Sequence, residues 1–214
     1  MNAEIMAQSI SIWQVIRPNF HIVWNLLLAL VPLVLSFLLF PESRRRSFFW
    51  WLGVGVFIAF LPNAPYTLTD IIHFLAKIQV QPPLPTWAII LLVIEFSLYF
   101  LVGFQSYVFS LINLGDYLQR RRLSNWLLPI ELSISALCSV GVYLGRFQRL
   151  NSWDIVTASE KAFHQTVEDL MNRQSLMVIL LLFVAIAVLY YIVKAIDLSI
   201  MGAWRGTNHP DSRK

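Results

Sequence analysis

Residues 176–196 read LMVILLLFVAIAVLYYIVKAI, a run in which Lys194 is the only charged side chain. A transmembrane helix needs about 20 predominantly apolar residues to cross the hydrocarbon of a bilayer, so this run predicts a membrane-spanning helix. Four further runs meet the same criterion: residues 20–40, 48–61, 87–112 and 126–145. The second is short, and we expect it to gain length from residues 63–66 or from a re-entrant turn. The sequence predicts an all-α, polytopic bundle of five transmembrane helices.

The composition of the whole chain is that of a membrane protein. Of its 214 residues, 57% are hydrophobic and 13% are charged, whereas about a quarter of the residues of a soluble domain are charged. The net charge of +4 would also suit a nucleic-acid-binding protein. However, the arginines stand in short clusters beside apolar runs, and no DNA- or RNA-binding motif accompanies them. We therefore expect no nucleic-acid partner, and anionic lipid headgroups are the expected counter-charge.

Arginine clusters set the predicted orientation. Residues 44–46 and 120–122 are all arginine and follow the first and third spans, and positively charged loops tend to stay in the cytoplasm. We therefore expect the N-terminus outside and the C-terminus inside, in a single membrane domain over residues 1–214. Tyr190, Tyr191 and Lys194 stand near the predicted end of the last span. There we expect the rings to lie at the headgroups and the lysine to snorkel.

Three segments outside the spans have characters of their own. Residues 1–19 have no basic start, and no cleavage site follows the first apolar run, so we expect an uncleaved N-terminal interfacial segment. Residues 157–171 combine a capping-box pattern with apolar side chains at helical spacing, which predicts an amphipathic helix on the outer surface. Residues 206–214 are expected to form a disordered tail.

Two acidic residues lie within the predicted spans, where a charge at mid-depth costs about 2.5–3.5 kcal/mol. Glu131 shares its helix face with Cys138 and Gly145, so it lies where close helix packing is expected. Glu95 belongs to a polar stripe that must face protein or water, and its other members are Tyr99, Ser106, Ser110 and Asn113. Two interpretations remain open: the acids are neutral and hydrogen-bonded to neighbouring helices, or they are stations for a proton or a cation.

A second polar group follows the short span. Asp70 and His73 stand three residues apart, with Asn63 and Tyr66 just before them. The two residues are weak candidates for metal ligands, or Asp70 is an acid that orients His73 as a general base. Alternatively, the pattern Thr67-x-x-Asp70 is a capping box in which Asp70 serves a helix N-terminus. Because zinc needs three or four ligands, we expect no bound metal and no cofactor.

Residues 146–154 are expected on the same outer side. Guanidinium groups bind carboxylates and phosphates bidentately, so Arg146 and Arg149 would hold an anionic headgroup or substrate, or pair with nearby acids. His21 and Asn25, one turn apart on the first span, are candidates to join them. We therefore predict an outer-leaflet polar site made of Asn63, Tyr66, Asp70, His73, Arg146, Arg149, Asn151 and Asp154.

Four motifs carry a resemblance to a known family: FLPNAPY (60–66), TDIIH (69–73), GVYLGRF (141–147) and NSWD (151–154). With these motifs in this order, the chain resembles the bacterial membrane family called domain of unknown function 1361. The resemblance implies a multi-pass protein of the bacterial cytoplasmic (inner) membrane, and it implies no activity. It places the following residues at the family's signature positions: Asn63, Pro65, Tyr66, Asp70, His73, Arg146, Asn151, Trp153 and Asp154.

Three classes of function remain open. The first is a membrane-embedded binding or transport-like module whose outer site takes a small solute or an anionic headgroup. The second is an accessory or assembly protein that presents helix faces to a membrane-protein partner. The third is an intramembrane enzyme acting on a lipid or phosphate-bearing substrate. The sequence has no His-Glu-x-x-His zinc helix, Gly-x-Ser-x-Gly elbow or nucleotide loop, and Cys138 lies in an apolar run. We therefore place the binding or transport-like module first and do not expect an enzyme.

Overall fold

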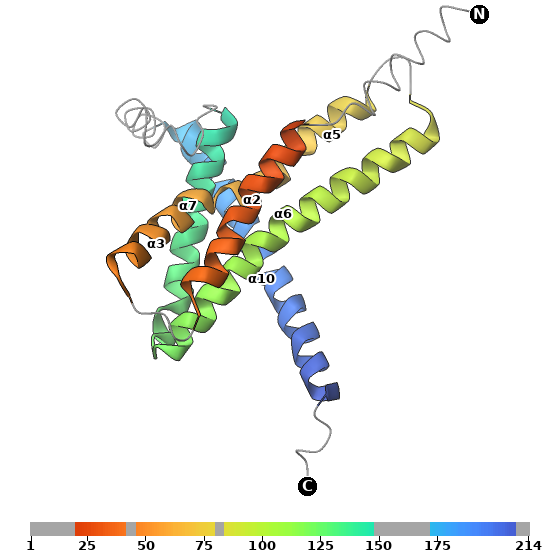
Figure 1. The fold of residues 1–214 in the computed structure, drawn as a ribbon. Helices are drawn as coiled ribbons and strands as arrows, with labels where there is room; N and C mark the ends of the chain where they lie inside the picture. The colour runs from red at the N-terminus through yellow and green to blue at the C-terminus, as the bar shows by residue number, and fades with distance from the viewer. Residues whose placement is uncertain (1–19, 42–45, 80–83, 148–171, 209–214) are drawn as a thin grey trace, which may run out of the picture. The chain divides into compact units, whose positions relative to one another are not determined.

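The computed structural model describes residues 20–41, 46–79, 84–147 and 172–208, and the regular elements among these residues are all helical (Figure 1). Five helical stretches in this part of the chain are long and apolar enough to cross a bilayer: Phe20–Leu39, Phe48–Ile78, Thr86–Arg120, Ser124–Phe147 and Arg173–Ala203. The predicted all-helical membrane fold with five spans is therefore confirmed. The predicted orientation stays a prediction, and residues 1–19 and 157–171 lie outside the described residues.

The chain divides into two compact units, which are described separately. The first comprises residues 1–35 and 46–107, and the second comprises residues 36–45 and 108–214. Helices α2 (Phe20–Leu39) and α6 (Thr86–Arg120) contribute residues to both units. A single membrane domain over residues 1–214 stays a prediction.

The core of the first unit is built on one face of α6. Its buried side chains recur every three or four residues, as on one stripe of a helix, and they are Ala88, Leu92, Phe96 and Tyr99, with Leu84 just before the helix. Leu26 of α2 and Phe74 of α5 (Ile71–Ile78) pack against them. This face brings α2 and α5 together around the N-terminal half of α6.

The second span continues through its prolines. Helix α3 (Phe48–Phe60) is followed by α4 (Asn63–Tyr66), the 3-10 turn η1 (Thr67–Asp70) and α5. The backbone is right-handed helical at the junction residues Leu61, Pro62, Tyr66 and Thr67. The gain in length through residues 63–66 is confirmed, because Phe48–Ile78 forms one long helical stretch. The alternative, a re-entrant turn at these residues, is wrong.

Additional hydrogen bonds hold the helical run around Pro62 and Pro65, which lack backbone N–H groups. The Asn63 side-chain amide donates to the Phe60 carbonyl at 2.9 Å. The Thr67 hydroxyl donates to the Ala64 carbonyl at 2.7 Å. In hydrocarbon an unsatisfied carbonyl is costly. Pro65 cannot donate to the Leu61 carbonyl, and the Ala64 N–H donates to it instead at 3.2 Å. The backbone therefore stays helical to the end of α5.

In the second unit, α6 extends well past its predicted end at residue 112. Asn113 Nδ2 donates to Ser36 Oγ at 2.8 Å, and Arg120 Nη2 donates to the Phe40 carbonyl at 3.0 Å. Both partners lie at the C-terminal end of α2. The polar residues that follow the apolar run are thus held by α2 and remain helical.

Helices α7 (Leu127–Phe147) and α10 (Arg173–Asn208) pack against each other in the second unit. The 3-10 turn η2 (Ser124–Trp126) leads into α7. Helix α10 has 36 residues, and at 1.5 Å per residue it is about 54 Å long, longer than the roughly 30 Å hydrocarbon core. It continues through residues 206–208, where the sequence predicted the start of a disordered tail.

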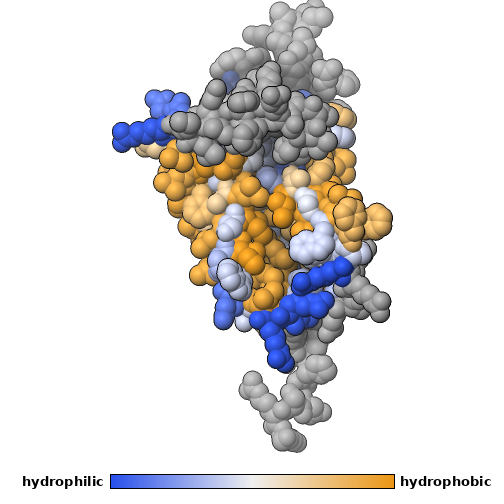
Figure 2. All heavy atoms as spheres, turned by 90° about the vertical axis from the view of Figure 1, so that its left-hand side faces the viewer, coloured by the Kyte–Doolittle hydropathy of each residue, from blue (hydrophilic) through white to orange (hydrophobic). Residues whose placement is uncertain are grey.

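Large apolar side chains are exposed on several helices. Phe48 is 78% exposed, Leu181 is 69% exposed and Phe37 is 63% exposed, and Figure 2 shows hydrophobic residues as a broad orange surface on the face in view. A soluble monomer rarely exposes extended apolar patches. These faces suit contact with lipid, and together with the five spans they identify a multi-pass membrane protein.

Candidate functional site

Asp70 is the centre of a polar cluster in the first unit. It is the last residue of η1, and only 4% of it is exposed. Asn25 of α2 donates from Nδ2 to Asp70 Oδ2 at 3.1 Å, and the Tyr99 hydroxyl of α6 donates to the same oxygen at 2.6 Å. One carboxylate oxygen therefore joins three helical elements. We call Asn25, Asp70, His73 and Tyr99 the Asp70 cluster.

His73 connects this cluster to the surface. Its Nε2 lies 3.8 Å from Asp70 Oδ1, on the side of the carboxylate that Asn25 and Tyr99 do not contact. The His73 side chain is 62% exposed, whereas that of Asp70 is 5% exposed. The distance is too long for a hydrogen bond but short enough for an ion pair when His73 is protonated. A buried acid thus stands behind an exposed imidazole.

The predicted capping box is wrong. The Thr67 hydroxyl donates to the Ala64 carbonyl, one turn back, and Asp70 precedes α5 without a side-chain hydrogen bond to the backbone of that helix. Asp70 instead directs its carboxylate to Asn25 and Tyr99. The acid therefore holds side chains of other helices rather than the start of its own helix.

The polar stripe of α6 faces protein, one of the two surroundings expected for it. Tyr99 binds Asp70, and the Ser106 hydroxyl donates to the Ala29 carbonyl of α2 at 2.5 Å. Ser110 is fully buried. Glu95 is half-buried and interacts electrostatically with Lys77 of α5. The stripe and the outer polar group, which the sequence treated as separate, meet at the Asp70–Tyr99 hydrogen bond.

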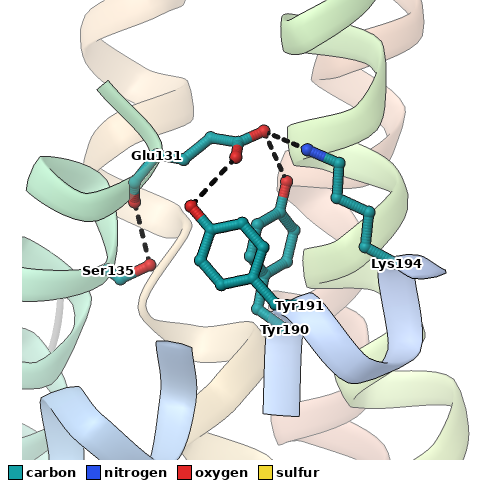
Figure 3. Close-up of polar contacts among 5 residues, drawn as sticks. All are labelled: Glu131, Ser135, Tyr190, Tyr191 and Lys194. Atoms are coloured by element: carbon teal, nitrogen blue, oxygen red, sulfur yellow. Dashed lines mark hydrogen bonds and ion pairs between the residues drawn. The ribbon is translucent and has the colours of Figure 1, made fainter. Parts of the chain in front are cut away.

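The second intramembrane acid, Glu131, is paired. Figure 3 shows its side chain reaching from α7 to three side chains of α10. Lys194 Nζ lies 2.5 Å from Glu131 Oε1, the Tyr190 hydroxyl donates to the same oxygen at 2.7 Å, and the Tyr191 hydroxyl donates to Oε2 at 3.2 Å. Glu131 is 3% exposed and Tyr190 is fully buried. We call Glu131, Tyr190, Tyr191 and Lys194 the Glu131 cluster.

Sequence reasoning missed the partners of Glu131. It placed Tyr190, Tyr191 and Lys194 at a membrane boundary because it ended the last span at residue 196. The helix continues to Asn208, so Lys194 lies within the span, and only 17% of its side chain is exposed. Residues 190, 191 and 194 fall on one helix face, and an intramembrane lysine calls for an acidic partner. Those two signals together would have identified the cluster.

The remaining predicted site residues are described one by one. Asn63 and Tyr66 are half-buried in α4, and the Asn63 amide binds the Phe60 carbonyl rather than Asp70. Arg146 is half-buried near the end of α7 in the second unit. Arg149, Asn151 and Asp154 lie outside the described residues. Of the predicted outer site, the structure therefore places Asp70 beside His73, and Asn25 donates a hydrogen bond to Asp70.

A transition-metal site has no support in the described residues. No three His, Cys, Asp or Glu side chains there gather in a way that would hold an ion. Asp70 and His73, the weak candidates from the sequence, are only two ligands, and Asn25 and Tyr99 already contact the carboxylate. The arrangement sets one buried carboxylate beside an exposed imidazole.

Comparisons with known proteins were made over the whole chain. No curated protein and no solved structure matched it. A family model described as "Protein of unknown function (DUF1361)" matches residues 24–188, which include the Asp70 cluster and Glu131. This match covers well over half of the chain, and the chain therefore belongs to the DUF1361 family.

Proposed function

We propose that this protein is a membrane-embedded, transport-like module that binds a small monovalent cation at Asp70, a proton or Na⁺. One observation carries the proposal: a carboxylate buried among spanning helices is held at one oxygen by Asn25 and Tyr99, while its other oxygen faces exposed His73. Ionisable residues within membrane spans are costly, and they commonly mark paths for ions and protons.

The roles of the neighbours follow from their chemistry. Asn25 and Tyr99 are neutral donors that fix the orientation of the carboxylate without cancelling its charge. His73 is exposed beside the buried acid, so its imidazole can carry a proton to or from Asp70. Two other titratable groups lie nearby: Tyr66 interacts electrostatically with Tyr99, and His21 is exposed one turn before Asn25 on α2. A protonated His73 would compete with a bound cation for Asp70.

We further propose the orientation in which this site opens outward. In that arrangement the N-terminus is outside, the C-terminus is inside, and Asp70 serves the outer leaflet of a bacterial cytoplasmic membrane. The arginine runs at residues 44–46 and 120–122 support it, because positively charged loops tend to stay in the cytoplasm. A cysteine-accessibility assay at His73, performed on intact cells, tests the assignment, and labelling only after lysis would contradict it.

The binding site predicts a specific loss on replacement of Asp70. In nanodiscs, we expect the unfolding midpoint of the full chain to depend on Na⁺ concentration or on pH, because a ligand that binds only the folded state stabilises it. The Asp70→Asn variant should lose the Na⁺ dependence, and its pH dependence should be smaller than that of the wild type. A Na⁺ series against choline at fixed pH and a pH series without Na⁺ distinguish the two cations, and full occupancy at 100 times the Kd is worth about 2.7 kcal/mol.

Two variants control this experiment. Asp116→Asn neutralises an exposed acid on α6 and should keep the wild-type dependence. His73→Gln alters an exposed side chain, so it should fold normally while changing the pH series. Equal responses of Asp70→Asn and the wild type to both cations would reject the site. Flux into liposomes through the wild type, and its loss in Asp70→Asn, tests the transport-like part.

A further inference from the structure

Helices α7 and α10 are joined by polar contacts of two different kinds. At one end, the Tyr143 hydroxyl donates to Ser175 Oγ at 2.8 Å, a contact between two neutral side chains. At the other end, the Glu131 cluster includes a charged pair. Both contacts join the same two helices. A change of charge in the Glu131 cluster would therefore alter the contact at one end of α7 and leave the neutral contact at the other end intact.

The charged end is not explained by stability alone. Moving a carboxylate and an ammonium out of water costs several kcal/mol each, and well-packed apolar residues often replace a buried pair without loss. Lys194 is the partner that can leave most easily. It has a four-carbon stem, part of its side chain is exposed, and such side chains can direct their ammonium groups toward a membrane boundary.

The hydroxyls of Tyr190 and Tyr191 can form hydrogen bonds with Glu131 in either of its protonation states. An ionised Glu131 accepts hydrogen bonds from Tyr190 and Tyr191, as observed. A protonated Glu131 can donate to a tyrosine oxygen, because a phenolic hydroxyl both donates and accepts. Both states therefore keep hydrogen bonds inside the membrane, and the ion pair with Lys194 is the contact that protonation weakens.

We propose that Glu131 is a second proton-binding site of this protein, and that its protonation releases Lys194 and separates α7 from α10 at this end. Binding forms an O–H bond on the Glu131 carboxylate with a proton from water, while Lys194 keeps its own proton. The site is distinct from Asp70 and does not depend on the cation-binding proposal.

The other groups around Glu131 leave it as the acid on which this change depends. From α6, Gly115 faces Glu131, since a Cβ built there would lie 3.8 Å from Oε1. The neighbouring acid Asp116 is exposed. On α10, Asp197 stands one turn beyond Lys194 and is half-buried. Arg146 lies toward the opposite end of α7, where the neutral Tyr143 contact is.

Spin-label distances test the proposal on the full chain in nanodiscs. In a Cys138→Ser background, one label pair at exposed Leu128 and Ile196 reports on the charged end, and a second pair at exposed Phe147 and Leu176 reports on the neutral end. Acidification should shift the first distance distribution to longer values and leave the second unchanged. The Glu131→Gln variant should show the long distribution already at neutral pH and should no longer respond to acid.

Two readouts keep the test decisive. If the first pair gives the same distances at neutral and acidic pH in the otherwise unchanged chain, the proposal is rejected. It is also rejected if Glu131→Gln still responds to acid, because another group then titrates. Infrared difference spectra of the chain with Glu131 intact provide a measurement that does not require a variant to fold. They should show a protonated-carboxyl band on acidification, and its absence overturns the proposal.

Discussion

Replacing Lys194 with methionine is expected to lower the free energy of unfolding by about 3–5 kcal/mol, the usual cost of removing one partner of a buried ion pair. Methionine keeps the length of the side chain but leaves the Glu131 carboxylate without its cation. Glu131 is 3% exposed, so water cannot replace the ammonium group at little cost. Reversible unfolding in mixed micelles measures the loss.

The companion variants separate charge from packing. Glu131→Gln/Lys194→Met removes both charges, keeps side chains of similar size and keeps an acceptor for the two tyrosines. It should recover most of the stability lost in Lys194→Met, because replacing both partners of a buried pair is often neutral. Asp116→Asn, which neutralises an exposed acid on α6, should stay within about 0.5 kcal/mol of the wild type. A loss below 1 kcal/mol in Lys194→Met would contradict the assignment of a buried, mutually dependent pair.

The number of spans could be predicted from the sequence because it depends on the length of apolar runs, and that length is fixed by the bilayer. The ends of α6 and α10 could not be predicted in this way. Hydropathy marks where a helix leaves hydrocarbon, whereas the helix itself continues as long as its backbone is satisfied. Asn113 and Arg120 continue α6 by binding the end of α2, and the sequence of their own segment does not predict that contact.

The same limit applies to the polar residues. The helical wheel correctly grouped Tyr99 with Ser106 on one face, because residues that share a face are set by the 3.6-residue period. It could not show that Asp70 would meet Tyr99, since that contact joins residues 29 positions apart on different helices. For Asp70 the local capping pattern predicted the wrong partner. A strong short-range pattern can therefore mislead when a buried donor from another helix competes for the same carboxylate.

Gly103 is the position on α6 where the smallest substitution should have a large effect on the first unit. A Cβ at this position would lie 2.6 Å from Thr67 Cγ2 and 2.9 Å from Thr67 Cβ. Thr67 is fully buried, and its hydroxyl is bound to the Ala64 carbonyl, so it cannot rotate away freely. We expect Gly103→Ala to cost about 1–3 kcal/mol, the range for overpacking a tight interior, measured by unfolding in mixed micelles.

A matched glycine distinguishes this clash from a general effect of alanine. A Cβ at Gly55 of α3 would meet nothing within 4 Å, so Gly55→Ala should be neutral or should stabilise the helix by up to about 1 kcal/mol. Thr67→Ala/Gly103→Ala removes the clashing atoms and should be more stable than Gly103→Ala alone. Equal losses in the Gly103 and Gly55 variants would contradict the close approach.

Because Thr67 begins the 3-10 turn that ends at Asp70, the displacement forced by Gly103→Ala should also move the carboxylate away from Asn25 and Tyr99. The cation dependence proposed for Asp70 should then weaken in Gly103→Ala and persist in Gly55→Ala.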